Sequence, residues 1–153
     1  PFTHVNPKGS RFSNGTFGVY YTARDLITAI RETAYHFEKF ALDSNDPPRR
    51  EVMRVLLGKV ANRFDDLDSV PNNKEFLNPI SYAASQPFGA DRRKVGSNGI
   101  SYPSVRHAGG RCIAAFWPNV VSIPIQERHL QYDWDGKRVA RYFDFRREEW
   151  TDL

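Results

Sequence analysis

The clearest pattern of apolar and polar positions lies in residues 24–42, where apolar side chains recur every three or four residues. The stripe is made of apolar residues with one threonine among them: Leu26, Ala29, Ile30, Thr33, Ala34, Phe37, Phe40 and Ala41. This spacing predicts an amphipathic helix. Thr22, followed three residues later by Asp25, resembles a capping box and predicts that the helix begins directly after it.

Short runs of β-branched and aromatic residues predict strands at 17–21, 51–60, 111–117 and 120–125. A helix is the alternative for 51–60, but the valines, Gly58 and the double proline before the run favour a strand. Residues 129–145 predict a hairpin in which Asp135 and Gly136 form a type I′ turn. A short helix is predicted near 79–90, interrupted or ended by Pro87 and Gly89, and 95–105 is loop-like.

This mixture predicts an α+β fold whose core is a mainly antiparallel sheet with a few helices. At 153 residues the chain has the size of one domain, and no linker divides it, so we expect a single globular domain over 1–153. The chain begins at Pro1 rather than at a methionine. It is therefore expected to be processed or to be a fragment of a longer protein whose N-terminal segment is missing.

The charge pattern favours an anionic partner without identifying it. The 22 Lys and Arg exceed the 18 Asp and Glu, giving a net charge of +4, and the arginines are scattered rather than clustered. Nucleic acid, a nucleotide or an acidic protein would all fit. The one cysteine, Cys112, lies in an apolar run and is expected to be an inert buried thiol. No apolar run reaches the roughly 18 residues of a membrane span, and we expect a protein of the reducing cytoplasm.

Several common catalytic motifs are absent from the sequence. There is no GxxxxGK[ST], GxSxG or HExxH segment, which argues against a P-loop enzyme, an α/β-hydrolase and a zinc protease. The histidines His4, His36, His107 and His129 lack the spacing of metal ligands. We therefore expect surface or core roles for them, and no metal site.

A few polar residues stand where they could serve a site or be purely structural. Glu32 lies just outside the apolar stripe of the predicted helix, so it borders either a pocket or solvent. Ser104 and Arg106 lie in a Gly- and Pro-rich segment, which is either a surface loop or a binding loop for an anion or a ribose. Tyr20 and Tyr21 are strand residues on opposite faces, for which a structural role suffices.

Two long stretches, "GSRFSNGTFGVYYTARDLITAIRETAYH" and "SQPFGADRRKVGSNGISYPSVRHAGGRCIAAF", resemble the RES domain family over about residues 9–145. The arginine, tyrosine, glutamate and serine of the family's pattern fall on Arg11, Tyr21, Glu32 and Ser104. The family is best known as the toxin half of bacterial toxin–antitoxin pairs. The resemblance implies a fold similar to that of diphtheria-toxin-type ADP-ribosyltransferases and degradation of NAD⁺, by phosphorolysis in some members and hydrolysis in others.

The resemblance also implies roles for these residues. Glu32 would stabilise the positive charge that grows on the ribose, and Arg11 would bind the pyrophosphate through its bidentate guanidinium. Ser104 would orient the ribose or the nicotinamide amide, and Tyr21 would offer an aromatic face to the nicotinamide. Tyr20 and Arg106 are weaker additions to the binding site, Arg106 as a second anion contact.

The expected partners follow from the same resemblance. NAD⁺ would be the substrate, without a separate cofactor, and inorganic phosphate a second substrate. A cognate antitoxin would be the protein partner, and neither a membrane nor nucleic acid is expected.

Three other functions remain as alternatives. A mono-ADP-ribosyltransferase would deliver the ribosyl group to a macromolecule. A basic RNA-binding or RNA-cleaving toxin would fit the charge, although the sequence has no RNP-like motif and no histidine pair placed for acid–base cleavage. A non-catalytic binding module fits poorly with the four matched positions.

Overall fold

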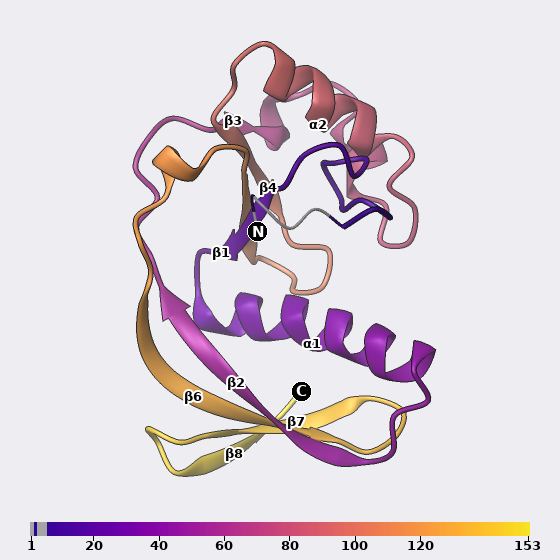
Figure 1. The fold of residues 1–153 in the computed structure, drawn as a ribbon, viewed down its shortest axis with the longest axis vertical. Coiled ribbons are helices and arrows are strands. Elements are labelled where there is room, and N and C mark those ends of the chain that lie inside the picture. The colour runs from indigo at the N-terminus through magenta and orange to yellow at the C-terminus, as the bar shows by residue number, and fades with distance from the viewer. Residues whose placement is uncertain (1, 3–5) are drawn as a thin grey trace. The chain divides into compact units, whose positions relative to one another are not determined.

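The computed structural model describes Phe2 and residues 6–153, and its contacts divide the chain into two compact units (Figure 1). Unit 1 comprises residues 1–29 and 60–122, and unit 2 comprises 30–59 and 123–153. Each unit contains one four-stranded sheet, so the predicted α+β class is confirmed. No helix in the described part has the length and apolar character needed to cross a membrane.

Unit 1 is built on a sheet with the strand order β1-β5-β4-β3. The strands are β1 (Tyr20–Ala23), β3 (Asp65–Asp66), β4 (Gly99–Pro103) and β5 (Arg111–Ala115). β5 pairs antiparallel with both β1 and β4, whereas β3 runs parallel to β4. Two short 3₁₀ helices, η1 (Leu67–Ser69) and η2 (Asn73–Leu77), follow β3.

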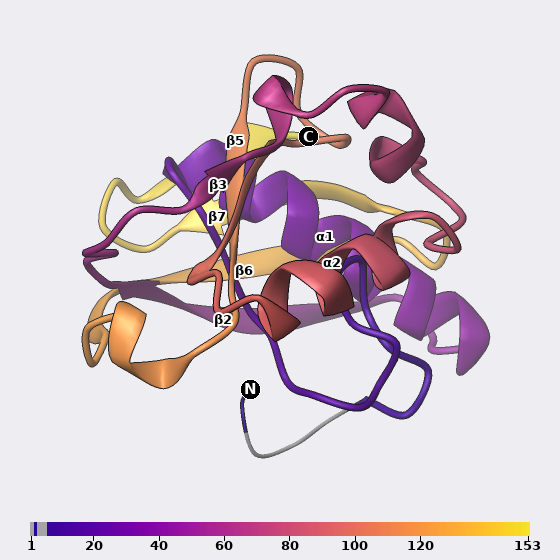
Figure 2. The same ribbon diagram turned by 90° about the horizontal axis from the view of Figure 1, so that it is seen from above.

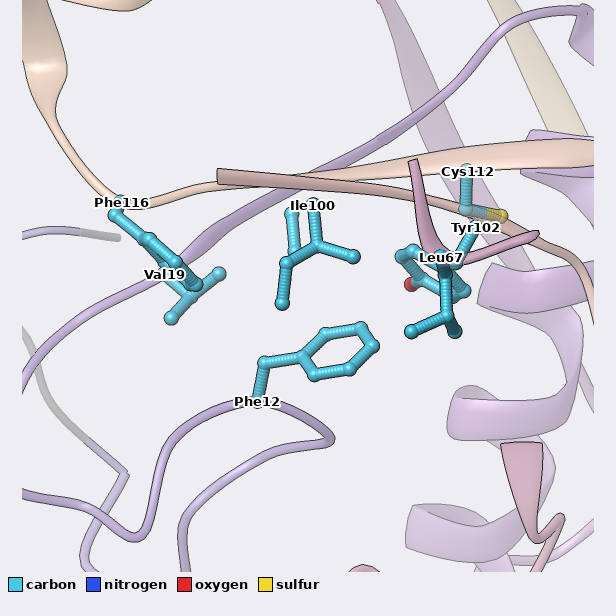
Figure 3. Close-up of a cluster of buried hydrophobic side chains, with 8 residues drawn as sticks. Phe12, Val19, Leu67, Ile100, Tyr102, Cys112 and Phe116 are labelled. Atoms are coloured by element: carbon cyan, nitrogen blue, oxygen red, sulfur yellow. The ribbon is translucent and has the colours of Figure 1, made fainter. Parts of the chain in front are cut away.

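The N-terminal loop contributes to the core of unit 1 (Figure 3). Its Phe12 is fully buried and packs edge to face on Tyr102 of β4, with ring centroids 5.0 Å apart. The cluster of buried side chains comprises Phe12, Val19, Leu67, Ile100, Tyr102, Cys112, Ala114 and Phe116. Cys112 is 3% exposed, which confirms the predicted burial of its thiol. Loop and sheet therefore form one packed body in this unit.

The helix α2 (Ser85–Lys94) lies beside the N-terminal loop (Figure 2). The predicted short helix is confirmed, but it spans 85–94 rather than 79–90, and Pro87 and Gly89 neither interrupt nor end it. Pro87 lies in the first turn, where a backbone N–H has no intrahelical acceptor and is not missed. Gly89 packs against the loop so closely that a Cβ there would lie 2.2 Å from the Phe12 carbonyl oxygen.

Unit 2 has the sheet order β2-β6-β7-β8, in which all neighbours are antiparallel. The strands are β2 (Arg49–Leu57), β6 (Ile125–Trp134), β7 (Val139–Asp144) and β8 (Glu149–Asp152). The helix α1 (Leu26–Asp43) begins in unit 1, and from Ile30 onward it belongs to unit 2 (Figure 1). The predicted helix, the strand at 51–60 and the hairpin strands are thus confirmed.

The core of unit 2 joins one side of α1 to the inward residues of β6 and β7. Ile30, Ala34 and Ala41 are buried, and Phe37 packs edge to face on Tyr132 and Trp134. Phe40 is 61% exposed, so the expectation that it widens the apolar stripe was wrong.

Two predicted strands and one predicted loop differ from the structure. The segment 95–105, predicted as a loop, contains the buried strand β4. Its Ile100 and Tyr102 both point toward the core, but they stand between residues that are typical of loops. The segment 120–125 holds the end of the 3₁₀ helix η3 (Pro118–Val120) and an isolated bridge from Val121 to Val60. The first strand begins at Tyr20 rather than at residue 17.

Two local motifs also differ. The N-terminus of α1 is capped by Asp25, whose Oδ1 accepts from the Thr28 backbone N–H at 2.9 Å, whereas Thr22 lies in β1. In the β6–β7 turn only Gly136 has a positive φ, 95°, so the turn is not type I′. The Asp135 carboxylate instead accepts from the backbone N–H groups of Lys137 and Arg138, at 2.8 and 2.9 Å.

The contact between α2 and the loop yields a stability prediction. In a helix interior, Gly→Ala ordinarily stabilises by about 0.5–1 kcal/mol. Gly89→Ala should instead destabilise the protein by about 1–3 kcal/mol, because the new methyl group collides with the Phe12 backbone. Urea unfolding measures the change. The exposed Asp91→Ala on the same helix should stay within about 0.5 kcal/mol of the parent, and a Gly89→Ala protein at least as stable as the parent would contradict the packing.

Candidate functional site

The hydroxyl of Tyr21 fixes the N-terminal loop to β1. It shares a hydrogen bond of 2.9 Å with Ser10 Oγ and accepts one of 3.0 Å from the Phe12 backbone N–H. Burial raises the pKa of Tyr21 to about 12, so the phenol stays protonated at neutral pH. Because Ser10 and Phe12 flank Arg11, these two bonds determine where the Arg11 side chain starts.

Arg11 is 7% exposed and reaches across unit 1 to the end of η2. Its Nη1 donates to the carbonyl oxygens of Phe76 and Asn78, each at 3.0 Å, and its Cζ lies 4.9 Å from the ring centroid of Tyr82. Carbonyl oxygens satisfy the N–H groups without neutralising the guanidinium. The hydrogen bonds found for Arg11 in the described residues all use Nη1, so Nε and Nη2 keep donor capacity beyond these bonds.

Ser104 begins the turn that connects β4 to β5. Its Oγ accepts from the backbone N–H groups of Arg106 and His107, at 3.1 and 3.0 Å, and its own N–H donates to the Gly110 carbonyl at 2.9 Å. The serine therefore orders the turn that bears it.

Arg106 extends from this turn to the segment that Arg11 also contacts. Its Nη2 donates to the carbonyl oxygen of Pro79, directly after the Asn78 carbonyl that Arg11 binds. Two guanidinium groups that are far apart in the sequence are thus attached to one short stretch of backbone in unit 1. A pair of this kind suits a ligand with more than one negative charge.

Sequence reasoning missed a partly buried chain of hydrogen bonds that connects the start of α1 to the Ser104 turn. Thr28, which is fully buried, donates from its hydroxyl to Asp25 Oδ2 at 2.8 Å, and Thr28 Oγ1 also lies 2.8 Å from His107 Nδ1. The Thr28 backbone N–H and hydroxyl help hold the pKa of Asp25 below its usual range. His107 therefore has a defined partner, whereas the sequence suggested only a surface or core role.

The donors and acceptors around the Thr28 hydroxyl determine the tautomer of the neutral His107 ring. The ionised Asp25 can only accept, so the single Thr28 proton points to it, and Thr28 Oγ1 must then accept from Nδ1–H of His107. In the neutral ring Nε2 then carries the lone pair. Gly110 makes this packing possible, since a Cβ there would lie 2.5 Å from Thr28 Oγ1. The turn with Ser104 and Arg106 is thereby anchored to the helix start.

Two further residues were predicted for the site, Glu32 and Tyr20. Glu32 is a partly buried residue on the part of α1 that belongs to unit 2. Tyr20 lies on the face of β1 opposite to Tyr21 and stacks on Phe2, with ring centroids 6.3 Å apart. The structure thus gathers Arg11 and Arg106 on one backbone segment, with Tyr21 and Ser104 supporting them. The ligand-binding roles of all six residues stay predictions.

Metal binding has no support in the described residues, where no group of three or more His, Cys, Asp or Glu side chains comes together. His4 lies outside the described residues.

Comparisons with known proteins concern the chain as a whole. A family model described as "RES domain" matches residues 1–135. An uncharacterized protein of Sinorhizobium fredii (strain NBRC 101917 / NGR234), y4oC, is 28% identical over 145 residues, which cover 95% of this chain and 60% of that protein. The chain therefore spans about 60% of the length of this relative.

The Thr28 hydrogen bonds yield a second prediction. Thr28→Val keeps the shape of the side chain but removes the hydroxyl that binds Asp25 Oδ2 and His107 Nδ1. The free energy of unfolding should therefore fall by about 1–3 kcal/mol. The bond to Asp25 stabilises the fold only while the carboxylate is ionised. The deficit should therefore be full at pH 7 and shrink as the pH falls through the lowered pKa of Asp25.

Nitrogen-15 spectra of the His107 ring provide an independent measurement. In the parent the neutral ring should be protonated at Nδ1, and Thr28→Val should give a mixture of both tautomers. Thr22→Val is the matched control, because within the described residues the one hydrogen bond found for the Thr22 hydroxyl is a 3.5 Å contact with the adjacent Ala23 carbonyl. A parent ring protonated at Nε2 would contradict the assignment.

Proposed function

The chain belongs to the RES domain family, and from this premise we propose that it is a toxin that degrades NAD⁺ by cleaving the bond between nicotinamide and ribose. Family membership supports a toxin-type role within a toxin–antitoxin context. The observation that carries the proposal is the attachment of Arg11 and Arg106 to the carbonyls of Phe76, Asn78 and Pro79. It holds two permanent cations in unit 1, which suits a reaction with two anions, the pyrophosphate of NAD⁺ and inorganic phosphate.

The proposed reaction needs charge stabilisation more than proton transfer. The nicotinamide of NAD⁺ is cationic and leaves as a neutral base, so no general acid has to protonate it. Positive charge grows on the ribose as the bond breaks, and a fixed carboxylate stabilises that charge. We assign this role to Glu32, which the helix α1 holds on a rigid backbone.

The other matched residues bind and orient the substrate in this proposal. Arg11 contacts the pyrophosphate through its Nε and Nη2 edge, since Nη1 is already bound to carbonyl oxygens. Tyr21 presents a ring face to the nicotinamide while its hydroxyl holds the loop. Ser104 orients the ribose or the amide. Tyr20 keeps only a weak role, because it stacks on Phe2 on the other face of β1.

We further propose that inorganic phosphate attacks the ribosyl cation. A cation this reactive needs little help from a base, so the product depends on which nucleophile is held within reach. Arg106 lies in a turn that is ordered by hydrogen bonds between Ser104 and its backbone and between Thr28 and His107. A guanidinium held in such a turn suits phosphate. The C1″–nicotinamide bond breaks, a phosphate oxygen bonds to C1″, and ADP-ribose 1″-phosphate forms. A cognate antitoxin would restrain this activity by covering the same residues.

Incubation with NAD⁺ labelled in its adenosine part tests the activity. Small labelled ADP-ribose species are expected, whereas label on protein or RNA would identify a transferase instead. Glu32→Gln should lower the cleavage rate at least about a hundredfold, which corresponds to the ~3 kcal/mol typical of lost charge stabilisation. Asp43→Asn removes an exposed carboxylate at the far end of α1 and should leave the rate unchanged. Normal turnover by a folded Glu32→Gln protein would refute the mechanism.

The nucleophile is tested by varying phosphate. The cleavage rate should rise and saturate with phosphate concentration, and Arg106→Ala should abolish the saturation and leave slow formation of ADP-ribose by water. The matched control is Arg24→Ala, which removes an exposed arginine before α1. If rates and products are the same in phosphate-free buffer, the protein is an NAD⁺ glycohydrolase.

A further inference from the structure

A pocket in unit 1 lies at the opposite end of the sheet from the Ser104 turn. It has a volume of about 320 Å³, and its lining includes Arg93, Phe17, Phe116 and Trp117. Phe116 and Trp117 directly follow β5, whereas the Ser104 turn directly precedes it. Five residues of extended strand, at about 3.3 Å each, separate the two places by roughly 16 Å. The pocket is therefore distinct from the site proposed for NAD⁺.

Arg93 of α2 is the one charged residue among the described residues that line this pocket. Its Cζ lies 4.1 Å from the ring centroid of Trp117 and 4.7 Å from that of Phe17. Among the ion pairs of the described residues none involves Arg93, and its Nε is sealed from solvent without a hydrogen-bond partner. The ring faces attract the cation, but they supply neither a hydrogen-bond acceptor nor a counter-charge.

The aromatic walls of the pocket are held in place. The Trp117 indole N–H donates to the Ser97 carbonyl at 2.9 Å, which fixes the ring that lies under Arg93. Phe17 packs edge to face on the buried Phe116, with ring centroids 5.9 Å apart. A ligand would therefore find a preformed apolar wall next to an unpaired guanidinium.

We propose that this pocket binds a carboxylate carried on an aromatic or otherwise apolar group. The Nη atoms of Arg93 are not among the sealed atoms, so they can donate a bidentate pair of hydrogen bonds to a carboxylate. The apolar body of the ligand lies against Phe17 and Trp117. The volume is at the lower end of the range for small-molecule sites and fits one ring with a short side chain.

The charge of the lining selects a monoanion. One guanidinium balances one negative charge, and the other lining residues, Phe2, Thr16, Phe17, Gly18, Phe116, Trp117 and Pro118, are uncharged. A phosphate dianion would keep an uncompensated charge next to aromatic rings, which is costly. The same carboxylate chemistry occurs in free aromatic acids and at the C-terminus of a peptide, and the experiment distinguishes these two sources.

The test uses phenylacetate as the probe, with phenylacetamide as its neutral analogue and phenyl phosphate as its dianionic analogue. Binding is followed through the Trp117 indole N–H signal, which a Trp117→Phe variant assigns. Phenylacetate should shift this signal saturably, and phenylacetamide should bind at least about tenfold more weakly. N-acetylphenylalanine represents the peptide terminus: if it binds more tightly than phenylacetate, the source is a peptide, and otherwise it is a small acid.

Variants test whether the Arg93 guanidinium binds the carboxylate of the probe. Arg93→Gln should weaken phenylacetate binding about tenfold or more, whereas Lys94→Gln, the same change of charge on the next and exposed residue, should not. Arg93→Lys keeps the positive charge but lacks the planar guanidinium with its paired N–H donors. It replaces Arg93→Gln in the test if that variant fails to fold. NAD⁺ cleavage should be unchanged in Lys94→Gln. Equal binding of the amide, tighter binding of phenyl phosphate, or equal loss in both Gln variants would overturn the proposal.

Discussion

The hydroxyl of Tyr21 is the contact on which the arrangement of unit 1 depends. It bonds to the residues on either side of Arg11 and thereby attaches an irregular glycine-rich loop to a β-strand. Burial keeps the phenol protonated, with a pKa of about 12, so this attachment does not change across the physiological pH range. Phe12 can then enter the core, and Arg11 can reach η2. A strand residue thus gives a defined position to a loop without regular structure.

The partners of the arginines in unit 1 determine how much charge each one presents. Arg111 is paired with Asp66 and Asp68, and Arg92 with Asp65, so these guanidinium groups are largely neutralised. Arg11 is held as firmly, but by carbonyl oxygens, and so keeps its full positive charge. Arg93 rests on aromatic rings. These arginines therefore differ in how much of their positive charge is compensated by neighbouring carboxylates.

The sequence predicted those parts of the fold in which neighbouring residues determine the structure. The helix α1 and the β6 and β7 strands follow from periodic apolar positions and from a turn that contains glycine. The strand β4 was hidden because its Gly99 and Pro103 are typical of loops. Gly99 is nonetheless required, since a Cβ there would lie 2.0 Å from the Ala114 carbonyl oxygen of the adjacent strand. Only the tertiary structure shows such a contact.

The candidate site also has parts that the sequence predicted and parts that only the tertiary structure shows. The resemblance to a family pointed to Arg11, Tyr21, Glu32 and Ser104, but not to the groups that hold them. Arg11 is 65 residues from Phe76, and Thr28 is 79 residues from His107, so no local pattern could pair them. The aspartate three residues before Thr28 was a usable signal, because an Asp at that spacing is a common helix cap.

The interleaving of the two units has a consequence for the synthesis of the protein on the ribosome. β1 is an edge strand whose partner is β5, so Tyr20–Ala23 can pair only after Arg111–Ala115 has been translated. The residues from Ile30 to Lys59 emerge in between, and they complete their own sheet only when β6 follows. Neither unit is a continuous segment that could fold during early translation. A nascent chain therefore carries Arg11 and Tyr21 in an unstructured state until most of the protein has been made.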